Sequence, residues 1–106
     1  MIIHLTKENH HLIEQATKPV VIDVFATWCG PCMDMKPVFE EVATSLQDSY
    51  TFATLNVDEA RELAIRYGIT SIPTLIFMDK GKVLGKETGY MTGDELRAKM
   101  NGYFHD

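Results

Sequence analysis

The stretch Val20-Val21-Ile22-Asp23-Val24-Phe25-Ala26-Thr27-Trp28-Cys29-Gly30-Pro31-Cys32 (residues 20–32) decides the fold. Residues 20–26 are rich in β-branched side chains and apolar without alternation, apart from Asp23, which predicts a strand buried on both faces. After Cys32, apolar residues recur at helical spacing to about Gln47, which predicts a long amphipathic helix. A buried strand therefore runs through a Cys-Gly-Pro-Cys motif directly into a helix.

The chain on either side of this stretch predicts further strands and helices. Before it, the chain predicts a strand at 2–5 and a helix from the N-cap Thr6 to about Ala16. After the long helix come a strand at 51–57 and a short helix capped by Asp58 and ended by Gly68. Strands at 74–78 and 82–88 and a last helix from Thr92 to about Phe104 complete the chain. The segment Asp79-Lys80-Gly81 fits a three-residue hairpin loop with its glycine in the left-handed conformation.

The order of these elements, β-α-β-α-β-α-β-β-α, defines the fold class. Parallel crossover units followed by an antiparallel hairpin predict an α/β protein with a mixed five-stranded central sheet and four helices, placed on both faces of that sheet. At 106 residues the chain is expected to form one domain, residues 1–106.

Composition and charge exclude several classes of protein. Apolar residues make up 45% and charged residues 24%, which is ordinary for a globular domain and unlike a disordered or collagen-like chain. Ten basic and fifteen acidic residues give a net charge of −5, so the basic surface that binds nucleic acid or anionic lipid is missing. We therefore expect no nucleic-acid partner and no membrane partner.

No targeting or membrane-spanning segment is recognisable. The longest apolar runs, at 20–22 and 75–78, are far shorter than the ~18 residues that span a bilayer. Residues 1–8 lack the basic start, apolar segment and cleavage site of a signal peptide. The expected location is the cytoplasm.

The two cysteines carry the chemistry. Cys29 is expected at the N-cap of the long helix and Cys32 one turn later, within reach of disulfide geometry. Pro31 suits the first helical turn, and Gly30 leaves the backbone beside the sulfur unobstructed. The positive end of the helix dipole favours a thiolate at Cys29, whereas burial disfavours one at Cys32. This asymmetry predicts an exposed nucleophile at Cys29 and a resolving thiol at Cys32.

Three other interpretations of the cysteine pair remain open. A structural disulfide closing so short a loop contributes only about 2 kcal/mol by the loop-entropy formula. A metal site usually needs four ligands, and no second Cys-x-x-Cys is present. Two inert core thiols are a third possibility. The other candidate metal ligands all lie near the chain ends: His4, His10, His11 and His105.

Taken together, these residues resemble the thioredoxin family across the whole chain. The resemblance rests on Trp28-Cys29-Gly30-Pro31-Cys32 after an Asp-containing strand, on Ile72-Pro73-Thr74 and on Gly89. It implies a thioredoxin fold and a monomeric protein-disulfide reductase that acts on disulfide-containing substrate proteins. It further implies a redox-active Cys29–Cys32 disulfide and no bound cofactor or metal. NADPH would be used only indirectly, through thioredoxin reductase as partner.

The resemblance also assigns roles to individual residues. Asp23 corresponds to the buried carboxylate that accepts a proton from Cys32, and Pro73 to a cis proline that packs against the disulfide. Substrate would pair with the backbone at Ile72 as a short added strand. The expected substrate-binding residues are Trp28, Gly30, Pro31, Ile72, Pro73 and Gly89.

The chain departs from the family near the expected site. Thr54 stands where a lysine is common, Met33 and Asp34 follow the second cysteine in place of a frequent lysine, and Phe25 stands where many members have a second tryptophan. Because burial disfavours a carboxylate and Thr54 carries no charge, the pKa of Asp23 is expected to lie above that of an ordinary aspartate.

Two other functions compete with a reductase. A thioredoxin-fold binding module with incidental cysteines is disfavoured by the intact Cys-Gly-Pro-Cys motif and by Asp23. An oxidase or isomerase of the same fold usually has a histidine between its cysteines. Gly30-Pro31 therefore favours the reducing function.

Overall fold

A five-stranded mixed sheet forms the centre of the molecule, and the computed structural model describes residues 1–105. The strands are β1 (Ile2–His4), β2 (Val20–Phe25), β3 (Thr51–Asn56), β4 (Thr74–Asp79) and β5 (Lys82–Thr88), in the spatial order β1-β3-β2-β4-β5. β1 and β2 both pair with β3 in parallel, whereas β4 pairs with β2 and β5 in antiparallel fashion. The mixed sheet expected from the sequence is confirmed.

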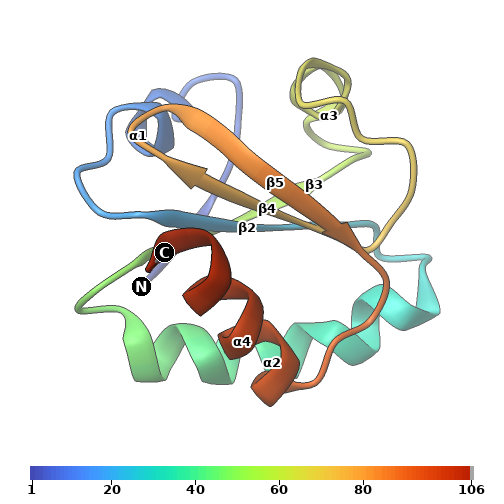
Figure 1. Ribbon diagram of the computed structural model, residues 1–106. Coiled ribbons are helices and arrows are strands. Elements are labelled where there is room, and N and C mark those ends of the chain that lie inside the picture. Colours follow the sequence, from blue (N-terminus) through green and yellow to red (C-terminus); the bar gives the residue numbers. More distant parts are fainter. Residues whose placement is uncertain (106) are drawn as a thin grey trace.

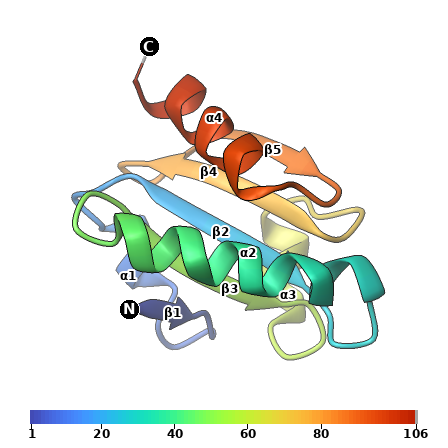
Figure 2. The same cartoon turned by 90° about the horizontal axis from the view of Figure 1, so that it is seen from below.

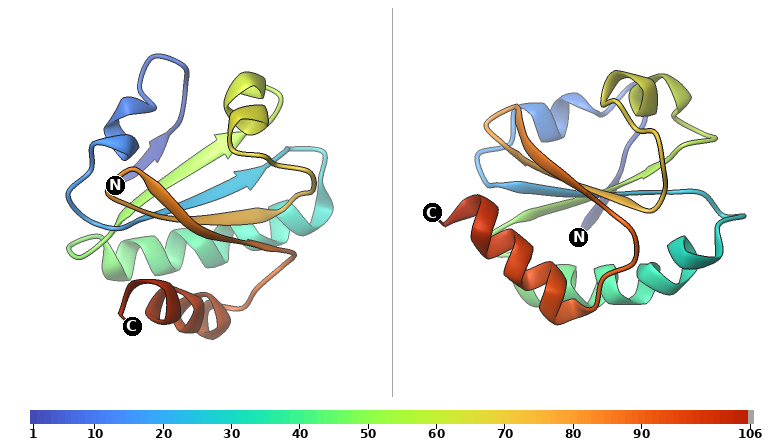
Figure 3. Two further views of the ribbon diagram at one scale, coloured as in Figure 1. Left: turned by 45° about the horizontal axis from the view of Figure 1, so that its top comes forward. Right: turned by 45° about the vertical axis from the view of Figure 1, so that its right-hand side comes forward.

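The helices cover both faces of this sheet. α2 (Gly30–Leu46) and α4 (Gly93–Phe104) lie below it in Figure 1, and α1 (His11–Glu14) and α3 (Arg61–Arg66) lie above it. Figure 2 looks directly onto α2 and α4, and both views of Figure 3 place these two helices on the same side of the sheet. None of the helices within residues 1–105 is long and apolar enough to cross a membrane.

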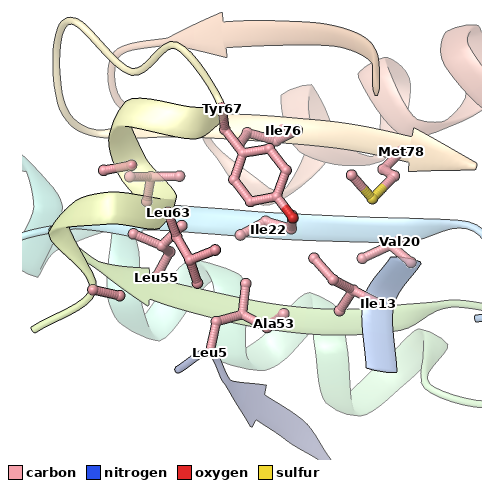
Figure 4. Packing of buried hydrophobic residues seen from close by; sticks show 13 residues of the cluster. Leu5, Ile13, Val20, Ile22, Ala53, Leu55, Leu63, Tyr67, Ile76 and Met78 are labelled. Atoms are coloured by element: carbon pink, nitrogen blue, oxygen red, sulfur yellow. The ribbon is translucent and has the colours of Figure 1, made fainter. Parts of the chain in front are cut away.

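The core is divided by the sheet because successive side chains of a strand point to opposite faces. Along β2, Val20, Ile22 and Val24 pack toward α1 and α3, in the cluster of Figure 4. Val21 packs on the opposite face against the residues of α2 and α4. Asp23 shares this second face by the same alternation, which directs its carboxyl group toward α2.

The first helix is shorter than expected. Thr6 does not start a helix that continues to Ala16; turns occupy residues 7–10, and α1 spans only His11–Glu14. The cause is local side-chain bonding, since Asn9 accepts a hydrogen bond from Thr6 N at 2.7 Å and donates one to His4 O at 2.9 Å. Such bonds offer the backbone an alternative to the helical pattern.

Asp58 does not cap the third helix. Asn56 Oδ1 accepts the hydrogen bond from Asp58 N at 2.9 Å, and α3 begins later, with Ala60 as its N-cap. Gly68 ends this helical region with a φ of 70°, as expected of a glycine stop.

The β4–β5 hairpin has a two-residue loop, one residue shorter than expected. Asp79 pairs with Lys82, which leaves only Lys80 and Gly81 in the loop. Both have positive φ, 51° and 79°, as a type I′ turn requires. The left-handed glycine is therefore confirmed and the loop length is wrong, because Lys80 accepts the conformation that the sequence assigned to Gly81 alone.

Candidate active site

The start of α2 holds the two cysteines. Cys29 is the N-cap residue with an extended backbone, and its Sγ accepts a hydrogen bond from Cys32 N at 3.3 Å. Pro31 occupies the first turn, where it removes a backbone donor that has no helical partner. The cysteines form a disulfide with their Cα atoms 5.2 Å apart. The strand-to-helix placement of the motif is confirmed.

Both cysteines are buried in the disulfide form, so the exposed Cys29 expected from the sequence is not seen, and the two residues differ only slightly in exposure. Cys29 is 7% exposed, whereas Cys32 is completely buried. The first turn of α2 contains no acidic residue, so nothing there offsets the positive end of the helix dipole beside Cys29. Among residues 1–105, no cluster of three or more His, Cys, Asp and Glu side chains is arranged to hold a metal ion.

Trp28 directly precedes Cys29 in the chain and is strongly exposed. Its side chain is 71% exposed, and its indole Nε1 donates a hydrogen bond to Asp58 Oδ2 at 2.9 Å. Asp58 thus orients the indole from the loop that precedes α3. The sequence indicates Asp58 only as a helix cap, and no local pattern connects it with Trp28, 30 positions earlier.

A groove of about 310 Å³ continues from Trp28 toward α3. Val57, Ile69 and Ile72 line it, together with the exposed side chain of Ile65. Ile72 also packs against the cluster that contains both cysteines. The groove therefore combines this apolar lining with the polar residues Asp58, Arg61, Thr70 and Ser71, and Ile72 links it to the cysteine cluster.

The segment before β4 borders the cysteine cluster through Ile72. The Ile72–Pro73 peptide bond is cis, as expected. Pro73 O accepts a hydrogen bond from Gly89 N at 2.9 Å, which ties the two chain segments together. Gly89 has a φ of 96°, and an added Cβ would meet no atom within 4 Å. Backbone conformation, not crowding, explains the glycine at this position.

Asp23 is buried in the middle of β2. It is 3% exposed, and its Oδ1 makes no hydrogen bond with any residue in the range 1–105. Burial raises its pKa from 3.8 to about 7, because a desolvated carboxylate is disfavoured. The expected upward direction of the Asp23 pKa is confirmed.

A small cavity connects Asp23 with Cys32. Its volume is about 50 Å³, and both side chains line it. The cavity also includes Thr54 from β3, His4 from β1 and Lys36 from α2. From the sequence alone His4 is only a candidate metal ligand, and no pattern singles out Lys36.

The replacements noted beside the motif have plain structural positions. Met33 packs against the cysteine cluster, Asp34 is exposed, and Phe25 at the end of β2 packs against the same cluster. Thr54 is hydrogen-bonded to His4.

The chain is similar to known proteins over most of its length. A family model described as thioredoxin matches residues 1–102. The chain belongs to the thioredoxin family. Thioredoxins are thiol–disulfide oxidoreductases, so this chain, with its redox-active cysteine pair, is a protein-disulfide reductase.

Individual thioredoxins are similar over most of their length. A thioredoxin of Alicyclobacillus acidocaldarius subsp. acidocaldarius is 44% identical over 96 residues, which cover 91% of this chain and 91% of the relative. One of Mycoplasmoides gallisepticum is 46% identical over 95 residues, covering 89% and 94%. A thioredoxin of Chlorobaculum thiosulfatiphilum is 38% identical over 89 residues, covering 84% and 82%.

Proposed function

We propose that Cys29 attacks the disulfide of a substrate protein and that Cys32 then resolves the mixed disulfide, with Asp23 accepting the proton of Cys32. The observation that carries this assignment is the difference between the two sulfurs at the start of α2. Cys29 is the N-cap residue and retains 7% of its exposure, whereas Cys32 lies within the first turn and is completely buried. The helix N-terminus favours the thiolate of Cys29, and the thiolate is the nucleophile in disulfide exchange.

The exchange proceeds in two substitutions at sulfur. The Cys29 thiolate attacks one sulfur of the substrate disulfide; a bond forms between them, and the other substrate sulfur leaves as a thiolate. Cys32 then loses its proton and attacks Cys29 Sγ. The Cys29–Cys32 bond forms as the mixed disulfide breaks, and the second substrate sulfur leaves as a thiolate. Two electrons pass from the protein to the substrate, and the departing thiolates take up protons from solvent.

Asp23 supplies the base for the second substitution. The carboxylate lines the same cavity as the buried Cys32 thiol, which has no direct access to solvent. A base is most effective when its pKa lies near the working pH, and the pKa of Asp23 is about 7. The burial that disfavours this carboxylate therefore also gives Asp23 the pKa that a base needs at neutral pH.

Substrate binds across the exposed surface around the disulfide. The backbone of Ile72 makes no backbone–backbone hydrogen bond within residues 1–105, so it is free to pair with an extended substrate segment. Trp28 and Ile72 supply apolar contact on one side of this surface. The full set of proposed substrate-binding residues is Trp28, Gly30, Pro31, Ile72, Pro73 and Gly89.

A partner must restore the dithiol after each cycle. We assign this step to a thioredoxin reductase that uses NADPH, with the chain acting as a monomeric electron carrier in the cytoplasm. Membership of the thioredoxin family supports this assignment. A reducing compartment is also where a catalytic dithiol of this kind is kept reduced.

Trapping of mixed disulfides tests the order of attack. Cys32→Ser should accumulate adducts with disulfide-containing proteins, because the resolving thiol is missing, whereas Cys29→Ser should accumulate none. Both variants are reduced, mixed with insulin and separated without reductant. Stable adducts through Cys32 in Cys29→Ser would overturn the assignment.

A coupled assay tests the partner. In the presence of NADPH and a bacterial thioredoxin reductase, the chain should reduce insulin with stoichiometric oxidation of NADPH. The double variant Cys29→Ser/Cys32→Ser is the control for background oxidation. Reduction by dithiothreitol without any reduction by the NADPH-dependent enzyme would refute the reductase assignment and leave the disulfide chemistry intact.

A further inference from the structure

Three polar side chains form a row across the sheet on the face that α2 covers. Asp23 of β2 is opposite Thr54 of β3, and Thr54 is opposite His4 of β1. The residues two positions earlier in each strand pack in the core cluster that includes α2: Ile2, Val21 and Phe52. Because side chains two apart share a face, Asp23, Thr54 and His4 point the same way.

Contacts link this row from the buried end to the surface. His4 Nδ1 and Thr54 Oγ1 are 2.7 Å apart, which is hydrogen-bond distance. Thr54 and Asp23 both line the cavity beside Cys32, and Asp23 Oδ1 has no hydrogen-bond partner among residues 1–105. The cavity volume of about 50 Å³ is enough for a water molecule, and these side chains provide the polar partners that such a water needs.

Solvent exposure also increases along the row. Asp23 and Cys32 are buried, Thr54 is half-buried and His4 is exposed. On the β4 side, Asp23 is opposite Leu75, which is apolar and buried. The polar direction away from Asp23 is therefore toward β3 and β1.

We propose that Thr54 and His4 carry the proton that Asp23 takes from Cys32 out to solvent. The proposal rests on the proposed role of Asp23 as the base for Cys32. Neutral Asp23 donates its proton through a cavity water to Thr54 Oγ1, the Thr54 hydroxyl proton passes to His4 Nδ1, and the proton on His4 Nε2 leaves to solvent. A hydroxyl both donates and accepts, and an imidazole exchanges protons near neutral pH, so each group regains its starting state after a tautomer change of the ring.

The pKa of Asp23, about 7, fits this use, because the carboxyl group changes its protonation state readily at neutral pH. The other titratable groups around the cavity are Cys32, Lys36 and Glu40, all from α2. Lys36 is the alternative exit for the proton, since it lines the same cavity and is exposed. The test therefore has to separate His4 from Lys36.

The two chemical steps can be followed separately when the symmetrical disulfide of thionitrobenzoate is the substrate. Reduced protein releases one coloured thiolate when Cys29 attacks and a second when Cys32 resolves the mixed disulfide. The second phase reports the step in which Cys32 loses its proton. It is followed by stopped flow in dilute buffer from about pH 5 to 9, a range centred on the pKa of Asp23, which is about 7. The first phase shows that each variant is folded and reactive.

His4→Ala and Thr54→Val should each slow the second phase about tenfold, less than the ~10²–10⁴-fold effect of losing a general base, and leave the first phase unchanged. Added imidazole should restore the rate of His4→Ala, because it replaces the missing ring at the exposed end. It should not restore Thr54→Val, in which the link to the cavity is broken. His11→Gln, another exposed histidine, is the matched control and should behave as wild type.

Three outcomes would overturn the proton route. The first is that His4→Ala and Thr54→Val resolve the mixed disulfide at the wild-type rate at every pH. The others are that added imidazole leaves the rate of His4→Ala unchanged, or that of these variants only Lys36→Gln slows the second phase. Asp23→Asn distinguishes this failure from failure of the proposed base. A slow second phase in Asp23→Asn with normal His4 and Thr54 variants refutes only the route, whereas a normal second phase in Asp23→Asn refutes the base.

Discussion

Two aspartates show how the surroundings of a single residue decide its use. Asp58 is exposed and orients Trp28 by accepting its indole N–H. Asp23 is buried with an unpaired Oδ1 among residues 1–105, and desolvation raises its pKa to about 7. The same functional group is therefore an ordinary surface acceptor in one place and, in the proposed mechanism, a proton acceptor at neutral pH in the other.

Burial of Asp23 should make stability depend on pH. Between the unfolded pKa of ~4 and the folded pKa, the unfolded chain is ionised while the folded chain is neutral, so unfolding releases a proton and stability falls as pH rises. Asp23→Asn removes this loss and should be more stable than wild type at pH 8, by on the order of 2–4 kcal/mol. Urea midpoints of both proteins at pH 4, 6 and 8 measure the effect, in the range set by the two pKa values.

The difference between the two proteins should shrink toward pH 4. Asp34→Asn is the control, since Asp34 is exposed and lies two residues after Cys32. An Asp23→Asn variant that is less stable than wild type at pH 8 would show that the carboxylate stabilises the fold.

At the scale of secondary-structure elements, the residue at which a helix begins determines where the site lies. α2 begins at Cys29 because the cysteine sulfur accepts the hydrogen bond from Cys32 N that a capping side chain would accept. α4 begins with a capping box, in which Thr92 Oγ1 accepts from Glu95 N and Glu95 Oε1 accepts from Thr92 N. From this start, α4 packs with α2 in one core cluster, on the face of the sheet that holds Asp23.

Loss of the α4 cap should weaken the fold without changing the chemistry. Thr92→Ala leaves the Glu95 amide without its partner and should lower the free energy of unfolding by about 1 kcal/mol, whereas Thr92→Ser keeps the hydroxyl and should lose much less. Urea denaturation gives the stability, and insulin reduction gives the activity. Equal stability of Thr92→Ala and Thr92→Ser would contradict this account.

At the scale of the whole molecule, a second polar cluster joins segments on the face opposite the long helices. Glu14 of α1 accepts hydrogen bonds from His10 at 2.9 Å and from Tyr67 at 3.3 Å. Burial alone would raise the pKa of Glu14, but the hydrogen bond and charge of His10 and the charge of Arg66 lower it. Lys86 of β5 donates to Tyr67 O at 2.8 Å and extends the cluster to the edge of the sheet.

This cluster should stabilise the molecule only while Glu14 is ionised. A depressed folded pKa contributes stability above the unfolded pKa, and that stability disappears as the pH falls through the folded value. Glu14→Gln should therefore cost less than about 1 kcal/mol at pH 7, since the group is partly exposed, and nothing at pH 2. Thermal unfolding at both pH values measures this, with the exposed Glu8→Gln as control; a cost that persists at pH 2 would indicate lost packing.

Local pattern alone determined much of this protein. The apolar run of β2, the Cys-Gly-Pro-Cys motif at its end and the helical period after it define the strand, the helix and the unequal cysteines, because each depends on neighbours within one or two turns. The buried position of Asp23 and the direction of its pKa follow from the same run. The helix start expected from local pattern is wrong where a side chain bonds to nearby backbone, as Asn9 does before α1.

Only the tertiary structure decided which distant residues meet. The partnership of Trp28 with Asp58 and the row of His4, Thr54 and Asp23 depend on the pairing of β1 and β2 with β3. Strand order and register are set by how the whole hydrophobic pattern is buried, and shifting a strand by one residue would turn every side chain to the other face. A short strand such as β1 carries too few residues for its sequence to specify that register, so packing of the complete sheet fixes where His4 lies.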